Sequence, residues 1–238
     1  MDHIIFLHGA LGSASQLQPL ISTYKEQDQS LICHSFDLSG HGEKSDIENK
    51  EIEFSIQQFS NDLKNYINSI ELRENRKIYV FGYSMGGYAA LNLAKESPGI
   101  IDKIFTLGTK FYWNEEIAKN EIEMLDPEKI EIKIPKFANI LKKRHSSDCW
   151  KKVLINTASL MNSLGKNPLL TNDVLKQINC KVRIAVGDRD NMVTIEESEN
   201  ASRVLNSGSF IVLSETYHPI EKVDLKRLCL ELKDFFKN

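Results

Sequence analysis

The stretch that most constrains the fold is Lys77–Leu91, which reads KIYVFGYSMGGYAAL. Residues Ile78–Phe81 are apolar and either β-branched or aromatic, which predicts a buried strand, and the small residues after the glycines predict a helix. Gly82 and Gly86 stand two residues on either side of Ser84. So tight a turn crowds both flanking positions, and glycine removes the crowding because it has no Cβ. The pattern predicts an exposed serine hydroxyl at a helix N-terminus, where backbone N–H groups favour a developing oxyanion.

Glycine and serine are common in ordinary turns, so this triplet alone does not establish a nucleophile. The alternative is a strand-to-helix loop without chemistry, and the triplet favours neither interpretation. The choice depends on whether the other parts of an acyl-transfer site occur elsewhere in the chain, in a suitable order.

Six short apolar runs alternate with segments of helical spacing along the chain. Runs without polar alternation are typical of parallel strands that are covered on both faces. The alternation predicts an α/β fold, with a three-layer, doubly wound and mainly parallel sheet of about six strands. The predicted strands span residues 4–7, 31–38, 78–81, 104–107, 182–186 and 210–213.

The strand signal disappears between residues 111 and 170, where only helical patterns remain. We therefore expect residues 1–238 to form one domain, with residues 111–170 inserted between strands four and five as a helical lid. The lid carries 10 Lys or Arg against 8 Asp or Glu, so it is nearly neutral, and its basic run at residues 142–145 is predicted to be a solvated helix face. Its apolar underside is predicted to include some of Trp113, Phe137, Leu141, Trp150 and Met161.

Composition excludes several classes of function. A formal net charge of -3 and a pI near 6.1 argue against nucleic acid or an anionic membrane as the main partner. No run approaches the roughly 20 apolar residues that span a bilayer, and the N-terminus shows no secretory leader, so we expect a cytoplasmic protein. The four cysteines are widely spaced and predict reduced thiols. We expect no metal and no cofactor, and either a monomer or a homodimer.

Four reactive-looking turns follow the carboxyl ends of predicted strands. They lie at His8-Gly9, Ser84, Asp190 and His218. In an open parallel sheet these ends share one edge, where ligands bind, so residues far apart in sequence are expected to converge there.

With these turns in place, the chain resembles the alpha/beta-hydrolase superfamily over essentially its whole length. In particular, it resembles a small esterase-like serine hydrolase with a helical lid. The order Ser84, Asp190, His218 matches the nucleophile, acid and histidine order of that fold. Five motifs in register make a chance match improbable. They are HGALG at 8–12, DLSGHG at 37–42, GYSMGG at 82–87, GDRDNMV at 187–193 and the final His218.

The chemistry of these residue types is consistent with the resemblance. A free serine hydroxyl is barely nucleophilic at neutral pH, and a histidine can take its proton and return it. An aspartate holds the imidazole in the correct tautomer. We therefore expect Ser84, Asp190 and His218 to be catalytic, with Asp190 preferred over Asp188 because it stands further from its strand and keeps the family spacing. The backbone N–H of Met85, and by resemblance that of Ala10, would form the oxyanion hole.

The substrate pocket is expected to involve Leu11, Phe111 and Trp113, where strand meets lid. His8 and His41 lie in glycine turns and are expected to hydrogen-bond the backbone rather than to act as bases. The chain departs from the family at its N-terminus, which has no room for the two additional strands of many members, and at Tyr217, where glycine is common. By resemblance, the reduced sheet has the strand order 2-1-3-4-5-6.

Two classes of function remain open. The first is a serine hydrolase that forms an acyl-enzyme with a small-molecule ester, thioester or amide, with a carbon-carbon lyase of the menaquinone pathway as a neighbouring possibility on the same fold. The second is a ligand receptor or regulatory binding protein that keeps the triad. The sequence does not choose among substrates, because the pocket determines them.

Overall fold

The computed structural model describes residues 1–45, 54–70 and 76–237. Within these ranges six parallel strands form one sheet in the order β2-β1-β3-β4-β5-β6, as predicted. After β2 has been added on one side of β1, the chain adds the remaining strands on the other side, so the switch point lies between β1 and β3, beside the turn at Ser84. The strands are β1 (Asp2–Leu7), β2 (Leu31–Ser35), β3 (Ile78–Tyr83), β4 (Lys103–Leu107), β5 (Lys181–Gly187) and β6 (Gly208–Leu213).

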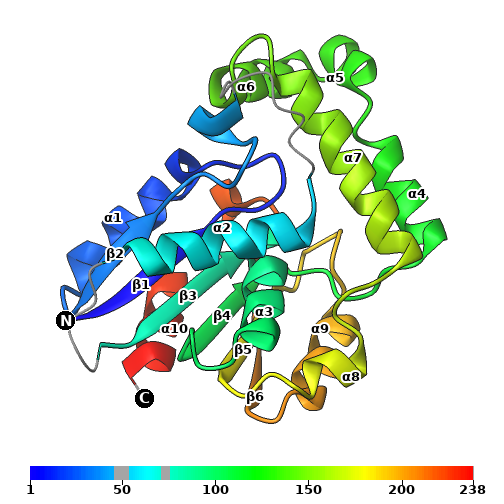
Figure 1. Cartoon of the computed structure of the whole chain (residues 1–238). Helices are drawn as coiled ribbons and strands as arrows, with labels where there is room; N and C mark the ends of the chain where they lie inside the picture. Colours follow the sequence, from blue (N-terminus) through cyan, green and yellow to red (C-terminus); the bar gives the residue numbers. More distant parts are fainter. Residues whose placement is uncertain (46–53, 71–75, 238) are drawn as a thin grey trace.

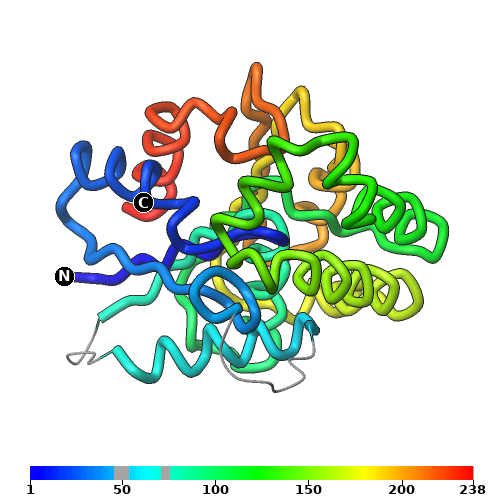
Figure 2. Tube along the Cα trace, turned by 90° about the horizontal axis from the view of Figure 1, so that it is seen from above, coloured from blue at the N-terminus to red at the C-terminus, as the bar shows by residue number. Residues whose placement is uncertain are grey.

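Helices cover both faces of the sheet (Figures 1 and 2). On one face lie α1 (Gln18–Gln27) and α10 (Leu225–Lys237), which pack against each other. On the other lie α2 (Ile56–Ser69), α3 (Met85–Glu96), α9 (Ile195–Val204) and the short α8 (Asn172–Leu175). Three 3-10 turns complete the core, η1 (Ala14–Leu17), η2 (Gly42–Ser45) and η3 (Ile220–Lys222).

Each face of the sheet has its own hydrophobic core, which accounts for the unbroken apolar runs of the strands. Ile5 and Val80 point into the core beneath α2 and α3, whereas Phe6 and Phe81 point into the core beneath α1 and α10. Successive side chains of a strand alternate between faces, so a strand covered on both faces must be apolar throughout.

Four of the helices between β4 and β5 stand above the carboxyl ends of the strands (Figure 1). They are α4 (Glu115–Glu123), α5 (Pro127–Lys133), α6 (Pro135–His145) and α7 (Trp150–Lys166). Helices α5, α6 and α7 share a small core around Leu141, Trp150 and Leu154, against which Leu11 of the β1 loop packs. We call residues 115–166 the insertion; its role as a lid stays a prediction.

Strand β2 is shorter than predicted, because it ends at Ser35 rather than Leu38. The N–H of Leu38 donates to His8 Nε2 at 3.1 Å, so the end of this segment binds a side chain of the β1 loop and leaves the sheet. In the part of the chain that the structure describes, every helix is too short or too polar to cross a bilayer.

The β3–α3 turn packs directly on the backbone of β1. A Cβ at Gly86 would lie 2.6 Å from both the Leu7 and His8 carbonyl oxygens, and one at Gly82 would lie 2.4 Å from Gly87 Cα. These distances are shorter than any van der Waals contact, so the turn can form only with glycine at these positions.

We predict that Gly86→Ala lowers the free energy of unfolding by about 3 kcal/mol, because the added methyl must displace the β1 backbone. Gly99→Ala is the matched control. Gly99 has a φ of +87° and nothing within 4 Å of an added Cβ, so its cost is the backbone strain alone, about 1 kcal/mol. Urea unfolding followed by circular dichroism measures both. Equal costs would show that the close approach at Gly86 is not what requires glycine.

Candidate active site

Ser84 stands at the tightest point of the β3–α3 turn, with φ 51° and ψ -117°. Positive φ is strained for a residue with a Cβ, and such strain persists only where neighbouring structure enforces it. Here the Ser84 N–H donates to the Leu107 carbonyl at 2.8 Å, and Thr109 Oγ1 donates to the Ser84 carbonyl at 2.9 Å. The end of β4 therefore holds Ser84 on both sides of its Cα.

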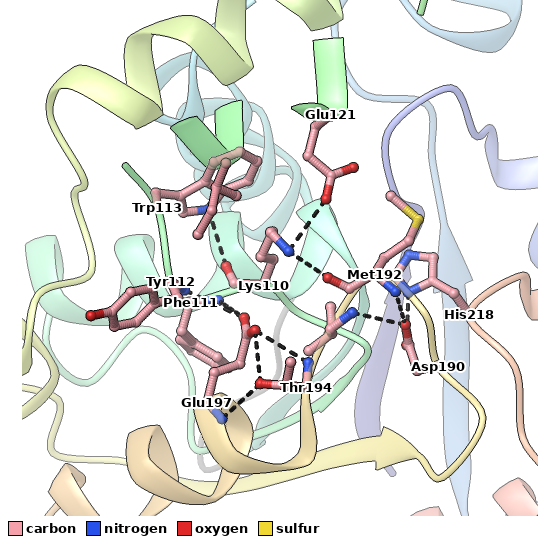
Figure 3. A network of polar contacts seen from close by, with 12 residues as sticks. Lys110, Phe111, Tyr112, Trp113, Glu121, Asp190, Met192, Thr194, Glu197 and His218 are labelled. Atoms are coloured by element: carbon pink, nitrogen blue, oxygen red, sulfur yellow. Dashed lines mark hydrogen bonds and ion pairs between the residues drawn. The ribbon is translucent and has the colours of Figure 1, made fainter. Parts of the chain in front are cut away.

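His218 and Asp190 form a close pair at the same edge of the sheet (Figure 3). His218 Nδ1 lies 2.8 Å from Asp190 Oδ2, and the two side chains are 9% and 2% exposed. The second oxygen, Asp190 Oδ1, accepts from the N–H groups of Met192 and Val193, each at 2.9 Å. The carboxylate is thus fixed on both oxygens, and His218 Nε2 is left to face another group.

The turn after β4 brings Ser84 and His218 together. A Cβ at Gly108 would lie 3.2 Å from the His218 ring and 3.3 Å from Asp190 Oδ2, while the adjacent Leu107 accepts from Ser84. Tyr83 OH also donates to the His218 carbonyl at 3.0 Å. Among the contacts of the described residues, the Ser84 hydroxyl makes no hydrogen bond to His218.

Asp188 has a different partner from Asp190. Its Oδ1 accepts from the Thr216 N–H at 3.1 Å, which ties the β5 loop to the segment before His218. Of the two aspartates, Asp190 is therefore the one whose carboxylate contacts the His218 imidazole.

The predicted oxyanion donors lie beside Ser84. Met85 is the first residue of α3, where N–H groups have no acceptor within the helix. Ala10 lines the same cavity as Ser84 and Met85, and a Cβ at its neighbour Gly9 would lie 3.0 Å from Ser84 Cβ. Both residues thus lie beside the cavity at Ser84, and their role as oxyanion donors stays a prediction.

A cavity of about 50 Å³ opens from Ser84. Its walls are mostly apolar and come from α3, α7 and the segment after β4. Of the three predicted pocket residues, only Trp113 lines this cavity. The lining residues are Ala10, Ile56, Ser84, Met85, Tyr88, Lys110, Trp113, Thr157, Leu160, Met161 and Leu164.

Phe111 and Leu11 lie elsewhere. The Phe111 N–H donates to Glu197 Oε1 of α9 at 3.0 Å, and the residue lines a separate, open cavity of about 550 Å³ beside α8 and α9. Leu11 packs against the core of the insertion. Of the predicted lid underside, Trp113 and Met161 line the cavity, whereas Leu141 and Trp150 are buried inside the insertion.

His8 and His41 bind backbone groups, as predicted. His8 Nε2 accepts from Leu38 N–H, so its proton lies on Nδ1, which donates to the Gly9 carbonyl at 2.8 Å. His41 Nδ1 contacts the Ser39 carbonyl at 3.1 Å. These bonds fix the shapes of the loops that follow β1 and β2.

Arg144 and His145 have a role that the sequence analysis missed. The prediction that residues 142–145 form a solvated helix face is wrong for these two. Arg144 Nη1 and His145 Nε2 both donate to the Leu11 carbonyl, at 2.8 and 2.9 Å, and His145 Nδ1 accepts from Gly42 N–H at 2.9 Å. Leu11 has a positive φ of 57°, so the insertion holds the loop of Ala10 in a strained conformation.

A helical pattern could have identified His145 as an inward-facing residue. Ala138, Leu141 and His145 recur at positions i, i+3 and i+7 and are all buried. The charges of the neighbouring lysines obscured this pattern.

The loop histidines are neutral at physiological pH. Burial lowers the pKa of both His8 and His145 to about 4, and burial also places the pKa of His41 well below its usual value. Protonation of His8 or His145 would put a proton on a nitrogen that now accepts a backbone N–H, so their bonds and their low pKa have the same structural basis.

Lys110 joins the insertion to the loop of Asp190. Its ammonium pairs with Glu121 of α4 at 3.3 Å and donates to the Met192 carbonyl, and both side chains are largely buried (Figure 3). Neither residue belonged to any motif in the sequence.

Residues 1–45, 54–70 and 76–237 contain no cluster of three or more His, Cys, Asp or Glu side chains that could hold a metal ion. The four cysteines, which all lie in the described ranges, form no disulfide bond.

Comparison with known proteins shows a widely shared fold. A family model described as serine aminopeptidase, S33, matches residues 2–204. Similar solved structures include MenH from S. aureus (18% identity, 99% of this chain and 93% of that chain, TM-score 0.76). They also include a malate-bound esterase from Thermogutta terrifontis (18% identity, 100% of this chain and 90% of that chain, TM-score 0.75). A third is the enol-lactonase from Burkholderia xenovorans LB400 (14% identity, 100% of this chain and 92% of that chain, TM-score 0.76). The comparison with curated proteins finds no match.

We predict that the protein loses stability as the pH falls from about 6.5 toward 4. In this window the unfolded chain binds protons at His8 and His145 that the folded chain excludes, so the free energy of unfolding rises with pH. Each histidine lowers stability by about 2 kcal/mol at pH 5. Urea unfolding at pH 5 to 8 measures the slope.

His145→Gln is the informative variant, because its amide can still donate to the Leu11 carbonyl but does not titrate. We expect its stability to depend less steeply on pH than that of the wild type. An unchanged slope would mean that His145 does not stay neutral in the folded protein.

Proposed function

The chain belongs to the alpha/beta-hydrolase family described as serine aminopeptidase, S33, and from this membership we propose that it is a serine hydrolase in which Ser84, His218 and Asp190 form the catalytic triad. The family gives the fold and hydrolysis. The residue roles, the acyl-enzyme and the substrate are our proposals.

The observation that carries this proposal is the 2.8 Å contact between His218 Nδ1 and Asp190 Oδ2. A buried carboxylate on Nδ1 keeps the proton there, and Nε2 then carries the lone pair that a general base needs. Ser84 stands on a strained turn held by Leu107, the residue before Gly108, against which the imidazole packs. A hydroxyl, a base and an orienting acid on one sheet edge support nucleophilic catalysis.

In the first step, Ser84 Oγ attacks the substrate carbonyl carbon while its proton passes to His218 Nε2. The hydroxyl and the imidazole, which are not hydrogen-bonded in the structure, turn into contact for this transfer. Asp190 stabilises the imidazolium that forms, and the N–H groups of Met85 and Ala10 stabilise the oxyanion.

In the second step, the tetrahedral intermediate expels the alcohol, thiol or amine, which takes the proton from His218. A water then attacks the acyl-enzyme, gives its proton to His218 and releases the carboxylic acid, with the proton returning to Ser84. The site thus needs only its own residues and water for hydrolysis.

The cavity supports a short, apolar acyl group. Its volume of about 50 Å³ accommodates roughly four water-sized groups, and residues such as Leu160 and Leu164 offer only hydrocarbon. We propose esters or thioesters with an acyl chain of about two to four carbons, and we propose that the insertion acts as the lid that limits this length.

We predict that a fluorophosphonate labels the protein once, at Ser84, and that Ser84→Ala is not labelled. The same variant should lose turnover of a p-nitrophenyl acetate or butyrate by about 10³-fold or more, because it removes the attacking hydroxyl and leaves only the proposed oxyanion donors and substrate binding. Mass spectrometry of the labelled peptide identifies the site. Stoichiometric labelling of Ser84→Ala would refute the assignment, and labelling without turnover would favour a receptor.

We predict that Met161→Ala shifts the preference toward longer acyl chains, because Met161 lines the cavity and its loss lengthens the space beyond Ser84. Each additional buried methylene contributes about 0.8 kcal/mol, so the ratio of kcat/KM for hexanoate over butyrate should rise about tenfold. Ile155→Ala, on the exposed side of the same helix, is the control. If both variants keep the wild-type ratio, α7 does not set chain length.

A further inference from the structure

Lys110 is the charged residue through which α4 of the insertion contacts the loop that orients Asp190. We propose that Lys110 is a positioning residue, which acts on the triad acid through the peptide group between Met192 and Val193. The proposal rests on the proposed function, because it requires Asp190 to serve His218.

One peptide plane connects the two residues. Its carbonyl, that of Met192, accepts from the Lys110 ammonium, and its N–H, that of Val193, donates to Asp190 Oδ1 at 2.9 Å. A cation on the carbonyl polarises the peptide and makes its N–H a stronger donor, because consecutive hydrogen bonds in a low-dielectric site strengthen one another. Lys110 thereby helps to hold the Asp190 carboxylate while its other oxygen contacts His218.

Glu121 keeps the ammonium in place. The side chains of Lys110 and Glu121 are only 16% and 10% exposed, and Glu121 Oε1 lies 3.3 Å from the ammonium. A buried lysine without a counter-charge would be costly, so the carboxylate from α4 makes the contact with Met192 possible. The position of α4 and the orientation of Asp190 are then linked through two side chains.

An alternative role for Lys110 has to be separated from this one. Its side chain also lines the cavity at Ser84, so it could act by touching the substrate. The two roles differ in their dependence on Asp190. A positioning residue has nothing left to act on when Asp190 is replaced, whereas a substrate contact is lost at the same cost in either background.

The experiment is a double-mutant cycle between Lys110→Met/Glu121→Gln and Asp190→Asn, in the full-length protein. Replacing both members of the ion pair avoids an unpaired buried carboxylate. We expect the pair variant to lower kcat for p-nitrophenyl butyrate about tenfold with KM within about twofold, and to cause less than about a twofold further loss in the Asp190→Asn background. An equal loss in both backgrounds, or full kcat in the pair variant, overturns the proposal.

A spectroscopic readout tests the same link without substrate. The proton between His218 Nδ1 and Asp190 Oδ2 should give a downfield proton resonance, which we expect to move upfield or broaden in the pair variant. Lys142→Met is the control, because Lys142 pairs with Glu131 elsewhere in the insertion, in a more exposed place away from the Asp190 loop. A resonance unchanged in the pair variant overturns the proposal.

Two further results keep the test decisive. If the methionine variant does not fold, Lys110→Gln/Glu121→Gln replaces it, since two amides can pair across the same gap, and the same coupling is expected. Full turnover by Asp190→Asn would refute the proposed triad itself, whereas an inactive Asp190→Asn beside a fully active pair variant refutes only the role of Lys110.

Discussion

Close backbone packing at the β3–α3 turn is the constraint on which the site depends. Gly86 lies against the carbonyls that end β1, and Ser84 donates to the carbonyl that ends β4. The strained φ of Ser84 is therefore maintained by the strands on both sides of β3, and not by the turn alone. The same register that forms the sheet core also exposes the hydroxyl and directs it toward the cavity.

The insertion contributes more than cavity walls. From α6, Arg144 and His145 bind the carbonyl of Leu11, next to the proposed oxyanion donor Ala10. From α4, Glu121 holds Lys110 against the carbonyl of Met192. Polar side chains of the insertion helices thus fix two loops at the edge of the sheet. One loop carries the proposed oxyanion donor Ala10, and the other carries the proposed triad acid Asp190.

The strand order of the sheet was predicted only by the resemblance to the superfamily, whereas the strands and the turn at Ser84 were predicted from local and repetitive signals in the sequence. Glycine spacing around Ser84 and apolar runs for the strands are both of this kind. The contacts of Lys110 and His145 were not predictable in the same way, because each joins segments about 80 or more residues apart and neither belongs to a motif. Phe111 lines a different cavity from Ser84, because its backbone is held by Glu197 of α9, and this contact between distant segments could not be read from the sequence.

The shared core of α5, α6 and α7 includes Leu11, a residue of the β1 loop. The contact of Leu11 with this core therefore limits which chimeric enzymes can be made from this chain. Exchange of residues 115–166 for the corresponding segment of another hydrolase would introduce a new set of cavity walls. It would also remove the apolar side chains against which Leu11 packs, and Arg144 and His145, which donate to the Leu11 carbonyl. A functional graft in this scaffold therefore has to be designed together with residues 8–12, as one modular unit made of two segments of chain.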